Sequence, residues 1–123
     1  MGAASEISPD SYTPVKQYDI RWANLPSPIG RRPVLLLTRT AGYAYLNKIV
    51  VAEVTSTIRG ISQEVPVGKR EGLSHASVVN LDNVHIIPKA LLGDRLGGLA
   101  SSREREVKRA LGYAFDWHEL KVL

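Results

Sequence analysis

The sequence of 123 residues contains no cysteine. Disulfides and thiolate metal sites are therefore excluded, and a reducing cytoplasm is permitted. No apolar run approaches the roughly 20 residues that a membrane-spanning helix needs. The N-terminus has no basic segment leading into an apolar one, so no secretory signal is expected. We predict a cytoplasmic protein with no membrane partner.

Patterns for catalysis by a metal, a nucleotide or a protein nucleophile are also missing. His75, His85 and His118 are isolated, without carboxylates at ligand spacing. No phosphate-loop, dinucleotide or nucleophile-elbow motif is present. We therefore expect no metal and no other cofactor. His85, inside an apolar run, is interpreted as a core or edge histidine, and Glu53, in another such run, as a solvated strand residue.

The charge and the length point to one domain with an acidic partner. The formal net charge is +4, which favours a partner such as nucleic acid. A chain of this length predicts a single domain. Residues 1–16 are small, polar and Pro/Ser-containing, so they are expected to form a flexible N-terminal tail. Residues 17–123 are expected to form the domain.

Short β-branched and apolar runs between turn residues predict a series of strands. The predicted strands are 18–25, 34–38, 48–54, 64–67, 77–81 and 84–87, with a further extended piece at 96–99. Pro66 places its strand at a sheet edge, because proline cannot donate a ladder hydrogen bond. A polar, glycine-flanked loop is expected at 68–72.

A helix is predicted near the C-terminus. Ser101 and Glu104 have the spacing of a capping box. Apolar residues then recur with helical spacing, at Val107, Ala110, Leu111, Ala114 and Phe115. Gly112 interrupts this helix, and a packing reason for it is expected. Together the elements predict a mainly β (α+β) fold, a small curved β-barrel or sandwich with a helix against it.

The stretch Arg31-Arg32-Pro33 leads into the apolar run 34–37. Proline suits the entry of a strand, so the arginines are expected at the strand's mouth beside a groove. Guanidinium groups on a rigid element are well suited to bind phosphate. This stretch alone leaves open that both arginines are solvated loop residues. Thr55 and Ser56 end another buried strand, where a hydroxyl can face a groove or cap a turn.

Four blocks, in this order, carry a resemblance to a known family. They are 18–25, 30–37, 54–60 with 64–67 and 71–73, and 77–84 with 95–99 and the final helix. Their order and spacing resemble the MazF/PemK-type toxins, the endoribonucleases (mRNA interferases) of type II toxin–antitoxin pairs. The resemblance implies an SH3-like barrel with a C-terminal helix, a homodimer, metal-independent cleavage of single-stranded RNA (mRNA, tRNA or rRNA), and a cognate antitoxin that blocks the groove.

The resemblance also implies roles for individual residues. Arg32 matches an acid–base or transition-state residue, and Thr55 matches one that holds the scissile phosphate. Cleavage by the RNA's own 2′-OH needs the phosphate placed in line and its charge stabilised, which an arginine and a hydroxyl can supply. Substitution of either is expected to affect cleavage far more than folding. Further RNA-binding candidates are Arg31, Ser56, Arg59, Lys69 and Arg70.

The chain departs from the family pattern in two places. Its first loop, 26–30, is short, and a loop glutamate that is catalytic in some members has no counterpart. His85-Ile86 stand where many members have a basic residue and threonine. The short loop motivates one alternative, a non-catalytic barrel that binds nucleic acid or protein. A second alternative is a toxin of the same fold that acts on a DNA topoisomerase, which no residue specifically favours.

Overall fold

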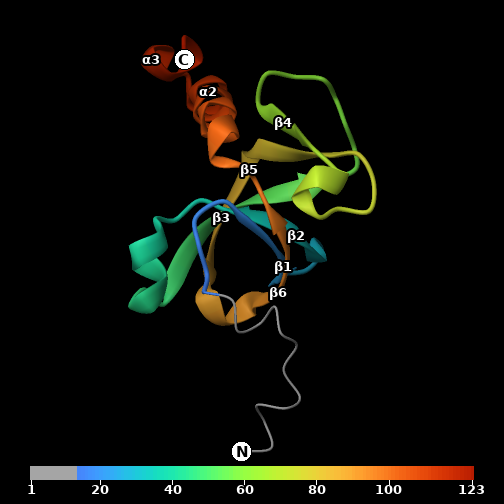
Figure 1. Ribbon diagram of the computed structural model, residues 1–123, viewed down its shortest axis with the longest axis vertical. Coiled ribbons are helices and arrows are strands. Elements are labelled where there is room, and N and C mark those ends of the chain that lie inside the picture. Colours follow the sequence, from blue (N-terminus) through green and yellow to red (C-terminus); the bar gives the residue numbers. More distant parts are fainter. Residues whose placement is uncertain (1–13) are drawn as a thin grey trace, which may run out of the picture.

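A curled antiparallel sheet dominates the computed structural model, which describes residues 14–123 (Figure 1). Within this range the sheet has six strands in the order β4-β5-β3-β2-β1-β6. The strands are β1 (Asp19–Leu25), β2 (Gly30–Leu36), β3 (Lys48–Thr55), β4 (Glu64–Val67), β5 (Ser77–Pro88) and β6 (Leu92–Gly98). Helix α2 (Glu104–Phe115) and the short α3 (His118–Lys121) follow. The predicted mainly β fold with a C-terminal helix is confirmed.

Two apolar clusters occupy the two faces of the sheet. Successive residues of a strand point to opposite faces, so Val34 and its neighbour Leu35 belong to different clusters, and both are fully buried. One cluster includes Val107 and Ala110 of α2, which cover that face. Because both faces of the central strands are buried, β2 and β3 contain continuous apolar runs. No helix in the described part of the chain is long and apolar enough to cross a membrane.

The second strand begins earlier than the sequence predicts. It runs from Gly30, so Arg31, Arg32 and Pro33 lie inside β2 and not at its mouth. Pairing with β1 extends the strand, with Pro33 opposite Trp22. β2 pairs with β3 only from Val34 onward. The preceding segment therefore has a free edge, where proline is tolerated. The prediction for Pro66 is confirmed, because β4 forms one edge of the sheet.

The two strands predicted at 77–81 and 84–87 form one long strand, β5, with an irregularity between them. Ala52 of β3 lies opposite Val84, but the next residue, Glu53, lies opposite Asn80. The side chain of Asn80 accepts a hydrogen bond from the backbone N–H of Asp82 at 2.9 Å within this bulge. Bulges bend a strand and re-aim its side chains, and this one lies beside the candidate site.

The C-terminal helix differs from its prediction at both ends. The expected capping box of Ser101 with Glu104 is wrong: 101–103 is a 3₁₀ turn, and no side chain caps α2. The Glu104 carboxylate instead accepts a hydrogen bond from the Tyr18 hydroxyl at 3.0 Å. At the other end, Phe115 is 51% exposed and stacks on Trp117 with ring centroids 4.8 Å apart. The apolar face of the helix therefore ends at Ala114, which still packs against the core, and does not include Phe115.

The glycine within α2 has the expected packing reason. A Cβ built on Gly112 would lie 2.7 Å from Cβ of Leu120, because α3 folds back onto α2 there. Residues 1–13 of the expected tail lie outside the described residues. Of the remainder, Val15 packs against the cluster on the sheet face opposite α2. The backbone N–H of Lys16 donates to the Asp19 carboxylate at 3.0 Å.

Candidate functional site

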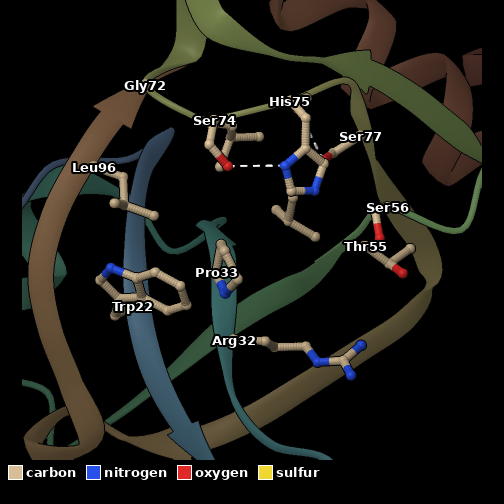
Figure 2. Close-up of a pocket in the computed structure, with 12 residues that line it drawn as sticks. Trp22, Arg32, Pro33, Thr55, Ser56, Gly72, Ser74, His75, Ser77 and Leu96 are labelled. Atoms are coloured by element: carbon tan, nitrogen blue, oxygen red, sulfur yellow. Dashed lines mark hydrogen bonds between the residues drawn. The ribbon is translucent and has the colours of Figure 1, made fainter.

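Two hollows meet at Arg32 and Thr55, which line both of them. The larger, of about 370 Å³, has mostly apolar walls and is drawn in Figure 2. Its walls include Trp22, Pro33, Leu73 and Leu96, and its polar side chains include Ser56, Ser74, His75 and Ser77. The smaller, of about 250 Å³, is polar and is also lined by Glu53, Thr57, Arg59, Asn80 and Asn83. The two expected catalytic residues therefore share one site.

Arg32 extends from β2 towards the side of the larger hollow where Thr55 lies (Figure 2). Its Nη1 donates to Oε1 of Glu53 at 2.9 Å. Its Nε is buried and has no hydrogen-bond partner among the described residues, but the side chain as a whole is 33% exposed. The guanidinium is thus held on one side by a carboxylate, and its exposed nitrogen keeps donor capacity for an acceptor in the site.

The environment of Glu53 differs from the one predicted from the sequence. It is 6% exposed, so the interpretation as a solvated strand residue is wrong. Its register partners lie on two strands, Val34 on β2 and Asn80 on β5, and these strands cover its flanks. Oε2 of Glu53 lies 2.5 Å from Nε2 of His85. His85, expected in the core or at an edge, is partly exposed and forms an ion pair with Glu53 when protonated.

Thr55 is the last residue of β3, and its hydroxyl oxygen accepts the backbone N–H of Thr57 at 3.1 Å. A hydroxyl has one donor proton besides its acceptor lone pairs. Because the turn uses the oxygen as acceptor, the proton of Thr55 remains available for a ligand. The sequence left open whether this hydroxyl caps a turn or faces a groove, and the Thr55 side chain does both.

The loop that carries Arg59 is fixed by a neighbouring carboxylate. Glu64 accepts the backbone N–H groups of Arg59 and Gly60 at 2.9–3.2 Å. These contacts use the backbone of Arg59, while Arg59 also lines the smaller hollow. Arg31 lines neither hollow, but its guanidinium carbon lies 3.9 Å from the centroid of a ring of Trp22, which lines the larger hollow.

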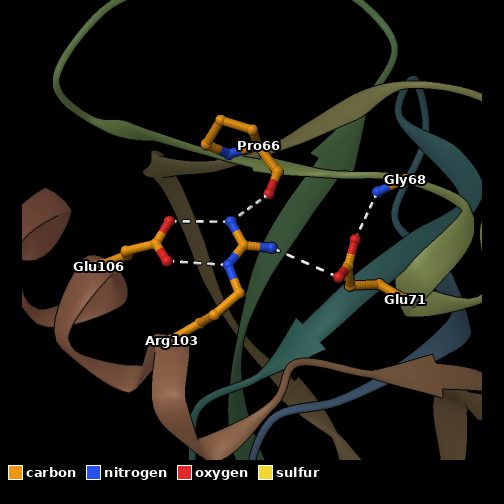
Figure 3. A network of polar contacts seen from close by, with 5 residues as sticks. All are labelled: Pro66, Gly68, Glu71, Arg103 and Glu106. Carbon is orange, nitrogen blue, oxygen red and sulfur yellow. Dashed lines mark hydrogen bonds and ion pairs between the residues drawn. The ribbon is translucent and has the colours of Figure 1, made fainter.

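Lys69 and Arg70 are exposed on a 3₁₀ turn and line neither hollow. The turn itself is anchored by Glu71, whose Oε1 accepts the backbone N–H of Gly68 at 2.7 Å. Arg103 reaches Oε2 of Glu71 at 3.4 Å and binds Glu106 with two nitrogens (Figure 3). Lys69 and Arg70, the two further residues predicted to bind RNA, thus lie on a firmly held turn and do not line the hollows that contain Arg32 and Thr55.

Sequence reasoning missed Trp22, Glu53, His75 and Asn80 as site residues. The one usable signal was Glu53, since a carboxylate inside an apolar run is costly to bury without partners. Trp22 was assigned to a strand, but its place beside Arg31 depends on the register of β1 with β2. Among the described residues, no group of three or more His, Asp or Glu side chains could hold a metal ion. The expected absence of a metal stays a prediction.

The curled six-stranded sheet with its C-terminal helix is the fold of a class of toxins, as a solved toxin structure with a TM-score of 0.75 shows. The model of the PemK-like, MazF-like toxins of type II toxin–antitoxin systems matches residues 16–115. The chain belongs to this family, and the resemblance inferred from its sequence is confirmed.

Relatives within the family are similar over most of the chain. The chain is 45% identical over 85 residues to endoribonuclease MazF3 of Mycobacterium tuberculosis, covering 69% of this chain and 82% of the relative. It is 39% identical over 99 residues to the probable endoribonuclease MazF5 of the same organism, covering 80% and 90%.

Solved structures agree with this assignment. Mycobacterium tuberculosis toxin MazF-mt6 matches with a TM-score of 0.75 and 42% identity, over 80% of this chain and 96% of that one. An endoribonuclease in complex with its cognate antitoxin, from a mycobacterial species, matches with a TM-score of 0.71 over 84% and 96%. At 24% identity, this second likeness shows the fold alone.

Proposed function

We propose that this chain is a toxin endoribonuclease that cleaves single-stranded RNA by attack of a 2′-OH on the adjacent phosphate, without a metal ion. The observation that carries the proposal is the convergence of Arg32 and Thr55 on one site, each with donor capacity left. The Arg32 side chain is 33% exposed and uses only Nη1 in a hydrogen bond among the described residues, while the Thr55 hydroxyl is used only as an acceptor. A phosphate between them would receive hydrogen bonds from two strands at once.

In this reaction the 2′-OH gives its proton to water and its oxygen forms a bond to phosphorus, while the bond from phosphorus to the 5′-oxygen breaks and that oxygen takes a proton from water. The products are a 2′,3′-cyclic phosphate and a 5′-hydroxyl. Negative charge develops on the non-bridging oxygens, where donors held in place stabilise it. Arginine keeps its proton at ordinary pH. Arg32 therefore contributes charge and orientation, with Thr55 as the second donor to the phosphate.

RNA would approach along the basic rim of the site. Arg59 lines the smaller hollow, and Arg31 lies over Trp22 at the larger one. We assign both arginines phosphate contacts, with Ser56 as a polar contact. Lys69 and Arg70 stand further away and would bind phosphates of the flanking chain. Trp22 carries Arg31 over one of its rings and also lines the larger hollow, where it offers a stacking surface. Single-stranded nucleic acid uses such surfaces without strict sequence preference.

We also propose a homodimer that works in the cytoplasm and is inhibited by a cognate antitoxin. Solved structures of the same fold include complexes of a toxin with its antitoxin. β4 and β6 are the sheet edges, and exposed edges favour pairing with another chain. Sedimentation at micromolar concentration is expected to give a dimer. A monomer at every concentration would contradict this part.

The cleavage proposal is tested with purified protein, free of antitoxin, on a mixed-sequence RNA in the presence of EDTA. Cleavage is expected, with cyclic phosphate and 5′-hydroxyl ends. A matched oligonucleotide with deoxyribose at the cut position should bind and stay intact. Cleavage that requires added Mg²⁺ would refute metal independence. Binding without any cleavage would favour the non-catalytic barrel.

A further inference from the structure

Arg32, Glu53 and His85 form a row across three adjacent strands, β2, β3 and β5. The row is continuous, because one carboxylate bridges both neighbours. Oε1 of Glu53 accepts from Nη1 of Arg32 at 2.9 Å, and Oε2 lies 2.5 Å from Nε2 of His85. Residues two apart on a strand share a face. Arg32 and Glu53 therefore lie on the same face of the sheet as Val34 and Val51, which are buried.

A carboxylate at the centre of this row is not needed for packing. Val34 and Val51, the neighbouring positions on the same face, are aliphatic and fully buried. An aliphatic residue in place of Glu53 would extend their cluster without the desolvation of a charge. Burying a carboxylate at 6% exposure is unfavourable unless its oxygens are paired. Here both oxygens are paired, one with Arg32 and one with His85.

The bridge restricts how Arg32 can present its guanidinium. With Nη1 held by Glu53, rotation of the planar group would break a charge-assisted hydrogen bond. The group lines both hollows in this orientation, beside Thr55. The imidazole of His85 in turn fixes the plane of the carboxylate. Arg32 is therefore oriented before any substrate arrives.

We propose that Glu53 and His85 are positioning residues for cleavage, which act through Arg32. This inference rests on the proposed function and deepens it. Glu53 sets the orientation of the Arg32 guanidinium towards the scissile phosphate, and His85 holds Glu53. Glu53 does this as a hydrogen-bond acceptor, so its shape matters more than its charge. Pre-orientation of donors contributes to rate because it need not be gained during the reaction.

Two substitutions of Glu53 should have different effects on kcat. Glu53→Ala frees the Arg32 side chain, and kcat should fall on the order of 10²-fold, as small misplacements in a site do. KM should fall or stay unchanged, because Arg32 is no longer neutralised and attracts phosphate at least as well. Glu53→Gln can accept from Arg32 with its oxygen and donate to neutral His85 with its nitrogen. It should therefore keep most of the wild-type kcat.

His85 provides an independent pair of variants. His85→Ala leaves Oε2 of Glu53 without its partner, and kcat should fall less than in Glu53→Ala. His85→Gln can again donate to that oxygen and should restore cleavage. Glu119→Ala, at an exposed carboxylate on α3, is the matched control and should leave kcat, KM and melting temperature unchanged.

A second readout does not depend on cleavage. The side-chain Nε–H resonance of Arg32, assigned with Arg32→Lys, should indicate an ordered group in wild type and in Glu53→Gln, and a mobile one in Glu53→Ala. If wild type cleaves no RNA but these spectra behave as described, the proposed function fails while the orientation by Glu53 stands. Wild-type kinetics and an ordered Arg32 in Glu53→Ala would overturn the positioning role. So would a Glu53→Gln variant that is as inactive as Glu53→Ala with Arg32 still ordered, because Glu53 would then transfer the proton itself.

Discussion

Gly72 and Gly97 lie backbone to backbone at one wall of the larger hollow. A Cβ on Gly72 would lie 2.0 Å from the carbonyl oxygen of Leu96, and a Cβ on Gly97 would lie 2.1 Å from that of Glu71. Gly72 also has a φ of +91°, which side-chain-bearing residues rarely adopt. The loop after the 68–72 turn is thereby held against β6, and Gly72 and Leu96 form adjoining parts of the wall.

Gly97→Ala is expected to lower stability and cleavage together. The new methyl group meets backbone that cannot rotate away, and such overpacking typically costs about 1–3 kcal/mol. The wall should move outward, away from Arg32. Gly93→Ala is the control, because its Cβ would have its nearest contact at an ordinary 3.4 Å, with Cβ of Trp22. Melting curves and cleavage rates of both variants test this. Equal melting temperatures would contradict the close approach.

Arg32→Ala should abolish most cleavage and also destabilise the fold. Loss of one donor to the transition state costs about 10²–10³ in rate. The sequence alone suggests little effect on folding, but the ion pair with buried Glu53 changes that expectation. A buried group that loses its partner costs about 1–3 kcal/mol. The double variant Arg32→Ala, Glu53→Gln should recover stability without recovering cleavage. A single variant that cleaves at the wild-type rate would refute the role of Arg32.

Arg32→Lys separates charge from geometry. Lysine keeps the positive charge but lacks the planar fork. We expect it to restore more of the unfolding free energy than of the cleavage rate, because Glu53 needs a cation and the phosphate needs an oriented donor. Denaturant unfolding and single-turnover cleavage, measured on the same samples, give the two quantities. Full recovery of the rate would indicate that charge alone is sufficient.

Thr55→Ser should retain more cleavage than Thr55→Val. Serine keeps both the acceptor for the Thr57 N–H and the proton that is free to donate. Valine keeps the shape and loses both. Single-turnover cleavage of the mixed-sequence RNA ranks the variants. A Thr55→Val rate equal to that of Thr55→Ser would indicate that the hydroxyl does not contact the phosphate.

The sequence predicted the strands well where burial on both faces produced uninterrupted apolar runs, as in β3. It could not predict the start of β2 at Gly30, because pairing with β1 extends that strand through residues with no strand preference. Pro33 also favoured a strand start at residue 34, four residues after the observed start of β2. The single long β5 was also missed, since Asp82 and Asn83 have the composition of a turn although they lie in a bulge.

The site was predicted in part, for a comparable reason. Arg32 and Thr55 were found through the family resemblance and a general argument about strand ends. Glu53 was assigned to solvent because its neighbours in space are 21 and 32 residues away, Arg32 and His85. A strand has two faces, and only its register with other strands decides which residues meet. Side chains that depend on register are therefore the ones that the sequence leaves undetermined.

Trp22→Ala should weaken RNA binding without changing its salt dependence. Loss of a base-stacking aromatic costs about 1–3 kcal/mol. Arg31→Ala should instead lower the slope of log affinity against log salt by about 0.7, for one phosphate contact on a single strand. Fluorescence anisotropy with a 2′-O-methyl oligonucleotide, which cannot be cleaved, measures both. Trp117→Ala, at a half-exposed tryptophan beside α3, is the control. An affinity unchanged in Trp22→Ala would exclude stacking on this ring.

The contact between Arg103 and Glu106 should make stability depend on pH in the acid range. The hydrogen bonds from Arg103 lower the pKa of Glu106 below its ordinary 4.5 (Figure 3). A carboxyl with a lower pKa in the folded state stabilises the fold above its unfolded-state pKa, and this contribution is lost as pH falls through the folded-state value.

The unfolding free energy should therefore decrease as pH falls below about 4.5, and Glu106→Gln should decrease less steeply there. Arg103 also donates to the backbone carbonyl of Pro66 and to Glu71, so the same contact holds α2 against β4 and the 68–72 turn. Denaturant unfolding at several pH values measures the slopes, with Glu119→Gln on the exposed side of α3 as the control. If Glu106→Gln and wild type have the same slope between neutral pH and the acid range, Arg103 does not stabilise the ionised carboxylate, and the attachment of the helix to the sheet must rest on apolar contacts such as Val107 and Ala110.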